Sequence, residues 1–113
     1  MAERTFFRLL RAARPTLRDF TSRFERGLPQ RPEVGETEAD WKGISVQDSV
    51  QGARRLARRS RFGSDCAVMR LPDFGPVRIE KTHGTGHWTL WGEPQAMLDT
   101  VVEVVNVLKD EQQ

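Results

Sequence analysis

The chain has 113 residues and a mass of 13.0 kDa, which is the size of one small domain with a single hydrophobic core. Hydrophobic residues make up 37% of the chain and charged residues 30%, a balance that excludes a disordered polymer and leaves a polar surface. The formal net charge is only +2, although the isoelectric point near 9.2 is basic. The charge therefore permits an acidic partner without requiring one.

Cys66 is the only cysteine, which excludes an intrachain disulfide and favours a reducing compartment. No apolar run approaches the roughly 18–20 residues of a membrane span. Residues 1–15 carry charges on both sides of a short apolar patch, which is not the pattern of a secretory signal. We therefore expect a soluble, cytoplasmic protein with no membrane partner.

The first third of the chain predicts a strand, a helix and a loop. Residues 5–10 (TFFRLL) favour a short strand, with the opening turn of a helix as the alternative, and Pro15 ends whichever forms. Residues 15–27 predict a helix that Gly27 terminates, because apolar residues recur there at helical spacing. Residues 28–40 hold prolines, a glycine and several acids, so we expect an acidic, proline-rich surface loop that is the most mobile internal segment.

Residues 41–46 (WKGISV) predict a strand, and the segment that follows predicts a helix capped by Asp48 or Ser49 and ended by Gly63. Ala53 and Ala57 lie on the inward face of that helix, with arginines on its other faces. The run from Cys66 to Leu71 then predicts a buried strand.

Residues 76–82 and 87–92 predict the two strands of a hairpin, joined by the turn sequence HGTG. The last element, residues 95–109, has an apolar stripe at helical spacing and predicts a helix that opens near Pro94. Its second half is rich in β-branched residues, so a strand is the alternative there. The chain as a whole predicts a single α+β domain, residues 1–113, with a small mixed, mostly antiparallel sheet and two or three helices.

The predicted hairpin separates an apolar face from a mixed polar face, because successive side chains of a strand point to opposite sides. Trp88 and Leu90 pair with the apolar residues of the first strand. The opposite face then gathers the side chains of a possible ligand-binding patch: Arg78, Glu80, His87, Thr89 and Trp91. The glycines of HGTG would let backbone N–H groups approach a phosphate, although a tight turn alone also explains them.

Other candidates for chemistry are weaker. His83 and His87 have no evident third partner, so we expect no metal. Arginine is concentrated in residues 1–31 and in residues 53–61 (ARRLARRSR), which is a second candidate surface. Arg54, Arg58 and Arg61 are its proposed contacts with nucleic acid or an acidic partner, with a solvated helix face as the alternative.

The order of elements resembles the ADP-ribosyltransferase-like fold, whose members share a split sheet around a nicotinamide-dinucleotide cleft. The residues that carry this resemblance are FFRLL with Arg8, the strand WKGISV, the helix DSVQGARRLA and the apolar strand CAVMRLP. The chain also resembles small bacterial proteins of unassigned function.

This resemblance implies an NAD-binding cleft and a reaction that is either ADP-ribosyl transfer or NAD hydrolysis. The implied walls of the cleft are Arg8, Trp41, Ser45, Glu80, His87, Thr89 and Trp91. Arg8 would hold a phosphate or ribose, Ser45 the ribose, and Trp41 or Trp91 would stack on the nicotinamide. Glu80 would stabilise the developing positive charge of the ribose, with His87 as the alternative for this third role.

Plainer interpretations stay open for the same residues. Arg8 is alternatively a surface arginine, Ser45 a strand hydroxyl and Trp41 a core or rim aromatic. The sequence therefore supports two functions. One is a nucleotide-binding domain with ADP-ribosyl transfer or NAD hydrolysis as its implied reaction, and the other is a non-enzymatic module that binds an acidic protein or nucleic acid. The sequence leaves the oligomeric state open.

Overall fold

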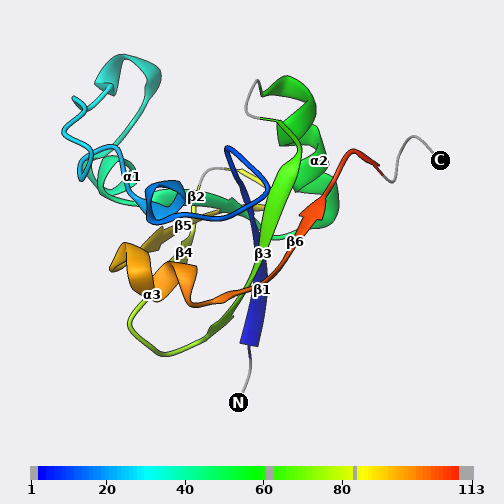
Figure 1. Ribbon diagram of the computed structural model, residues 1–113. Helices are drawn as coiled ribbons and strands as arrows, with labels where there is room; N and C mark the ends of the chain where they lie inside the picture. Colours follow the sequence, from blue (N-terminus) through cyan, green and yellow to red (C-terminus); the bar gives the residue numbers. More distant parts are fainter. Residues whose placement is uncertain (1–2, 61–62, 83, 110–113) are drawn as a thin grey trace.

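The computed structural model describes residues 3–60, 63–82 and 84–109. One six-stranded sheet, with the strand order β4-β5-β2-β1-β3-β6, forms its centre (Figure 1). The strands are β1 (Glu3–Leu9), β2 (Ile44–Gln47), β3 (Asp65–Pro72), β4 (Arg78–Lys81), β5 (His87–Trp91) and β6 (Val101–Asn106). The helices are α1 (Glu38–Lys42), α2 (Val50–Arg59) and α3 (Pro94–Leu98), with the 3-10 turns η1 (Leu17–Phe20) and η2 (Pro32–Val34). Each strand pairing is antiparallel, so the predicted α+β class is confirmed.

The two faces of the sheet carry different cores. Ala53 and Ala57 of α2 pack on one face with Cys66 of β3. On the other face, Phe20 of η1 and Met97 of α3 pack against a larger core formed by the central strands. α3 lies beside η1 in Figure 1, and the two elements are in contact. Helical segments therefore cover both faces of the sheet.

The pairing of β1 with its two neighbours is unequal. With β3, β1 pairs over its whole length, from Glu3 opposite Pro72 to Leu9 opposite Cys66. With β2, β1 forms a single register pair, between Phe7 and Gln47. We call this short junction the seam. It joins the half-sheet β4-β5-β2 to the half-sheet β1-β3-β6.

Several predicted elements are confirmed. Ser49 caps α2 by accepting a hydrogen bond from the Gly52 N–H at 3.0 Å, and Ala53 and Ala57 are buried as expected. The helix ends at Arg59, before the predicted stop at Gly63. The buried strand β3 and the hairpin β4–β5 form as predicted, and Gly84 and Gly86 in the turn have positive φ.

The predicted helix over residues 15–27 is wrong, because only η1 and a turn ending at Gly27 form there. Thr21 is extended, with φ −97° and ψ 126°. Ser22 and Glu25 then exchange side-chain hydrogen bonds with each other's backbone N–H groups, at 3.1 and 2.9 Å. Such local bonds compete with the helical backbone and start a new turn instead.

Two further boundaries differ from the prediction. Trp41 belongs to α1 rather than to a strand, because Thr37 and Asp40 form a capping box that starts a helix inside the expected loop. The long C-terminal helix is also wrong beyond Leu98, since Val101–Asn106 form β6 on the edge of β3. The β-branched alternative is therefore correct for that segment. No helix of the described residues is long and apolar enough to cross a membrane.

Candidate anion-binding site

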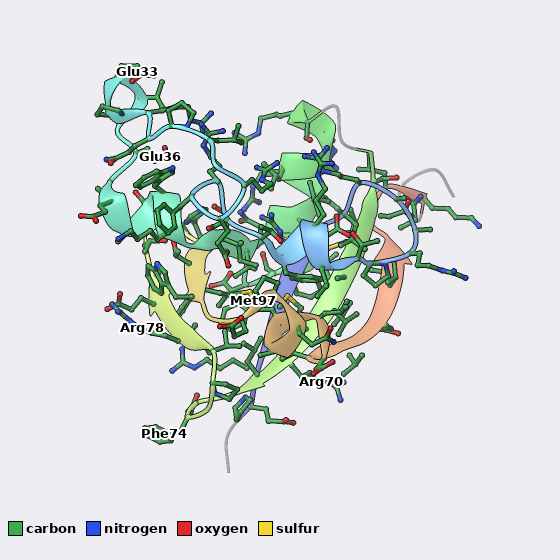
Figure 2. All side chains as sticks on the ribbon, turned by 60° about the vertical axis from the view of Figure 1, so that its left-hand side comes forward. Glu33, Glu36, Arg70, Phe74, Arg78 and Met97 are labelled. Carbon is green, nitrogen blue, oxygen red and sulfur yellow. The ribbon has the colours of Figure 1, made fainter. Side chains whose placement is uncertain are left out.

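Two adjacent cavities lie at the seam. The larger has a volume of about 540 Å³ and the smaller about 160 Å³, and both are lined by Arg8, Thr21, Arg26 and Ser45. Six arginines line the two cavities together: Arg8, Arg11, Arg18, Arg23, Arg26 and Arg31. We call the combined region the arginine cleft. In Figure 2, nitrogen atoms gather between the cyan segment that carries Glu36 and the green helix α2.

Arg8 reaches across the seam from β1. Its Nε donates to the Asp19 carbonyl oxygen at 2.9 Å, and its Nη1 donates to the Ser45 carbonyl oxygen at 2.8 Å. Burial lowers the pKa of Arg8 to about 10; the carboxylate of Asp19 opposes this effect, while Arg26 and Arg11 add to it. The guanidinium stays charged at neutral pH, in surroundings that disfavour its charge.

Arg18 and Arg26 are the least compensated charges in the cleft. Within the described part of the chain, neither side chain has a hydrogen-bond or ion-pair partner. Desolvation lowers the pKa of Arg26, and the positive charges of Arg11, Arg18 and Arg23 lower it further. An anion placed among these side chains would relieve their mutual repulsion.

The acids of the cleft already have partners. Asp19 is buried, and its carboxylate accepts from the Thr16 N–H at 2.8 Å and the Arg11 N–H at 3.3 Å. Glu36 accepts from the Arg31 N–H at 2.7 Å, and its Oε2 lies 3.4 Å from Arg23 Nε. Glu36 thus compensates the charges of Arg23 and Arg31 in the larger cavity. Asp19, the acid of the smaller cavity, is held by backbone N–H groups.

Three of the seven cleft residues implied by the resemblance lie together. Arg8, Ser45 and His87 line the larger cavity. Ser45 takes part through its carbonyl oxygen, which holds Arg8. The Nδ1 atom of His87 lies 2.9 Å from the Thr82 hydroxyl, which fixes the ring at the end of β5.

The two tryptophans of the implied cleft lie elsewhere and hold α1 in place. Trp41 Nε1 donates to the Leu28 carbonyl oxygen at 2.8 Å, and its ring meets that of Phe24 edge-on. Trp91 Nε1 donates to the Ala39 carbonyl oxygen at 2.8 Å, and the guanidinium of Arg78 lies over its ring. Neither tryptophan lines the arginine cleft.

Glu80 and Thr89 also lie outside the arginine cleft. Glu80 is exposed on β4 and pairs with Arg78 at 2.8 Å. Thr89 is 2% exposed, and its hydroxyl shares a hydrogen bond with that of Thr82 at 2.8 Å. The polar face of the hairpin therefore does not form one site, because His87 is its only residue that lines the arginine cleft.

The arginines proposed on the helix face have different environments. Arg54 Nε donates to the Val107 carbonyl oxygen at 2.9 Å, so it fastens α2 to the end of β6. Arg58 is exposed. Arg61 and His83 lie outside the described residues.

Sequence reasoning missed five of the six cleft arginines: Arg11, Arg18, Arg23, Arg26 and Arg31. Arg18, Arg23 and Arg26 lie where the sequence predicts a helix but only η1 and a turn form. Arg11 and Arg31 lie in loops, so helical spacing could not bring the five together. The only signal in the sequence was the density of arginine in residues 1–31.

Cys66 lies buried in β3. Burial raises the pKa of the Cys66 thiol to about 12, so it is protonated at neutral pH. Among the residues that the structure describes, no group of three or more His, Cys, Asp or Glu side chains is placed to hold a metal ion.

Comparison of the chain with protein-family models, with curated proteins and with solved structures gives no match.

Proposed function

We propose that the protein binds a nucleotide, or a similar phosphate-bearing small molecule, in the arginine cleft. The observation that carries this proposal is the convergence of Arg8, Arg18 and Arg26 on one cavity whose acid, Asp19, is already bonded to the backbone. Guanidinium groups match the geometry of phosphate oxygens and form charge-assisted hydrogen bonds with them. Binding would supply the negative charge that this cluster lacks.

The size of the cleft supports a nucleotide over a bare anion. The larger cavity, of about 540 Å³, falls within the range of roughly 300–1,000 Å³ that is typical of small-molecule sites. Thr21, Ser45 and His87 border it and offer polar groups beyond the phosphate contacts. These groups suit a ribose or a base.

The resemblance to the ADP-ribosyltransferase-like fold makes NAD the first dinucleotide to test. Arg8 and Ser45 lie together, which supports their roles in that hypothesis. Glu80 lies outside the arginine cleft, so it gives no support to ADP-ribosyl transfer or NAD hydrolysis. Glu36 and Asp40 are the carboxylates that border the larger cavity. We therefore propose binding alone, and the same experiment measures any cleavage of NAD.

Isothermal titration calorimetry with ATP, NAD and adenosine tests the proposal. We expect saturable binding of the two phosphate-bearing ligands, with adenosine much weaker. Arg26→Gln should weaken ATP binding at least about tenfold, because a charge-assisted hydrogen bond contributes roughly 1.5–3 kcal/mol. Nicotinamide release, measured in the NAD samples, reports any cleavage.

Arg70→Gln is the matched control, since it removes the same charge from an exposed position on β3 outside both cavities (Figure 2). It should leave ATP affinity unchanged. Equal losses in the two variants would show only a non-specific charge effect. Absence of binding to the unaltered protein at millimolar ligand would refute the proposal.

A further inference from the structure

The basic lining of the arginine cleft continues onto α2. Leu56 and Ser60 of this helix line the smaller cavity. Arg59 is three residues after Leu56, so it lies on the flank of the helix next to the cavity. Arg55 is one turn before Arg59, on the solvent side of the helix opposite Ala53 and Ala57. Both arginines are exposed, and Arg59 Nε donates to the Arg55 carbonyl oxygen at 3.3 Å. A row of positive charge therefore leads out of the cleft.

The other flank of α2 has a different role. Arg54 lies on it and is bonded to the Val107 carbonyl oxygen, so this flank faces the end of β6. The arginines of the helix are thus not equivalent. Arg55 and Arg59 extend the cleft, whereas Arg54 contributes to the packing of the helix.

The pattern fits a chain of phosphates better than a single free nucleotide. The smaller cavity has four arginines in its lining, and two more stand about 6 Å apart along the axis of α2, on its solvent side. Successive phosphates of an extended strand suit such a row. An acidic protein is a poorer match, because none of the large apolar side chains that are exposed among the described residues lies on α2, and protein interfaces have an apolar core.

We propose that the arginine cleft takes the unpaired terminal nucleotide of a single-stranded nucleic acid, while Arg55 and Arg59 contact the phosphates that follow it. This inference rests on the proposed function of the cleft and names its substrate class. A duplex end is excluded from this arrangement, because a paired base would keep the terminal nucleotide out of the cavity.

Fluorescence anisotropy with a single strand of about 12 nucleotides, phosphorylated at its 5′ end and labelled at its 3′ end, tests this proposal. DNA and RNA of one sequence are both used, since contacts to phosphates suit either. We expect one or both to bind at least about tenfold more tightly than ATP at low salt, with affinity falling steeply as salt rises. The double variant Arg55→Gln/Arg59→Gln should lose at least about tenfold in strand affinity.

The same double variant should keep its affinity for ATP, which also shows that it is folded. Arg70→Gln/Arg78→Gln is the control, with the same change of charge at exposed positions away from α2. Strand affinity no higher than that of ATP, or unaffected by the α2 variant, would overturn this inference and leave the nucleotide site standing. Absence of binding to both probes would overturn both proposals.

Two further probes complete the test. A blunt duplex of the same sequence should bind more weakly than the single strand, and equal binding would contradict capture of a strand end. Polyglutamate of similar charge should also bind more weakly. If it bound as tightly as the strand, an acidic protein would replace nucleic acid as the partner.

Discussion

The guanidinium of Arg8 connects three parts of the chain. It starts on β1 and donates to the carbonyl oxygens of Asp19 at η1 and Ser45 on β2. It also borders both cavities of the arginine cleft. Replacing Arg8 would remove a cleft charge and two hydrogen bonds at once, one to η1 and one across the seam to β2. Arg26, whose side chain has no such bonds within the described chain, is therefore the better probe of ligand binding.

Gly43 allows α1 and the start of β2 to pack closely against β5. A Cβ atom at this position would lie 2.5 Å from Thr89 Cγ2, 2.8 Å from Trp91 Nε1 and 2.9 Å from the Leu90 carbonyl oxygen. The backbone there is extended, so the conflict is steric and not conformational. Gly43→Ala should therefore lower the free energy of unfolding by about 1–3 kcal/mol, the usual cost of overpacking.

Urea unfolding followed by tryptophan fluorescence measures this loss. Gly75→Ala is the matched control, because its Cβ would meet only Pro72 Cγ, at an ordinary 3.4 Å. A Gly43→Ala protein as stable as the control would mean that β5 and α1 are not packed as described.

Glu36 helps to hold the segment between Gln30 and Glu36, together with backbone hydrogen bonds within it. Glu36 accepts from the Arg31 N–H, its backbone oxygen accepts from Gln30 Nε2 at 3.0 Å, and its carboxylate pairs with Arg23. Its side chain is only 9% exposed. The carboxylate thus competes with any anion for Arg23 and Arg31 in the larger cavity.

Glu36→Gln should strengthen ATP binding roughly fivefold, because removal of about 1 kcal/mol of repulsion has that effect. Glu33→Gln is the control, since Glu33 lies exposed at the outer tip of the same segment, away from Glu36 (Figure 2). Isothermal titration calorimetry of both variants with ATP measures these affinities. A weaker affinity after Glu36→Gln would show that this acid organises the arginines more than it competes for them.

Local signals explain which elements the sequence predicted. α2, β3 and the hairpin each carry a cap, a turn or an apolar run within the segment itself. Residues 101–106 carry a helical stripe but pair with β3, and distant pairing of this kind overrides local periodicity. Similarly, the exchange of bonds between Ser22 and Glu25 is visible only once the backbone is folded.

The candidate site was only partly predictable for a related reason. The order of elements pointed to Arg8 and Ser45, which lie on strands. Arg18 lies in η1 and Arg26 in the turn that follows it, where the sequence predicts one continuous helix, and the packing of η1 brings them to the seam. The resemblance implies that Trp41 or Trp91 stacks on a ligand, whereas their N–H groups donate to the backbone carbonyl oxygens of Leu28 and Ala39. An apolar ring with a polar edge serves either purpose, and the sequence alone does not distinguish them.

The whole molecule is organised around the seam. The half-sheets β4-β5-β2 and β1-β3-β6 (Figure 1) meet through one register pair. The arginine cleft lies beside this pair, since Arg8 of β1 and Ser45 of β2 line both cavities. A bound phosphate would contact side chains from β1, η1 and the segment that follows η1. The bound phosphate would therefore connect parts of the fold that share few backbone hydrogen bonds.

The most direct test of the central claim is amide chemical-shift mapping by NMR during titration with ATP. We expect the largest shifts at the cleft, in residues 18–26, 35–36, 43–45 and 87. A third cavity, bordered by Arg4, Lys81 and Trp88 near the exposed Phe74, provides an internal comparison on the same molecule (Figure 2). Shifts confined to the cleft would support the account. Shifts at the third cavity with none at the seam would contradict it.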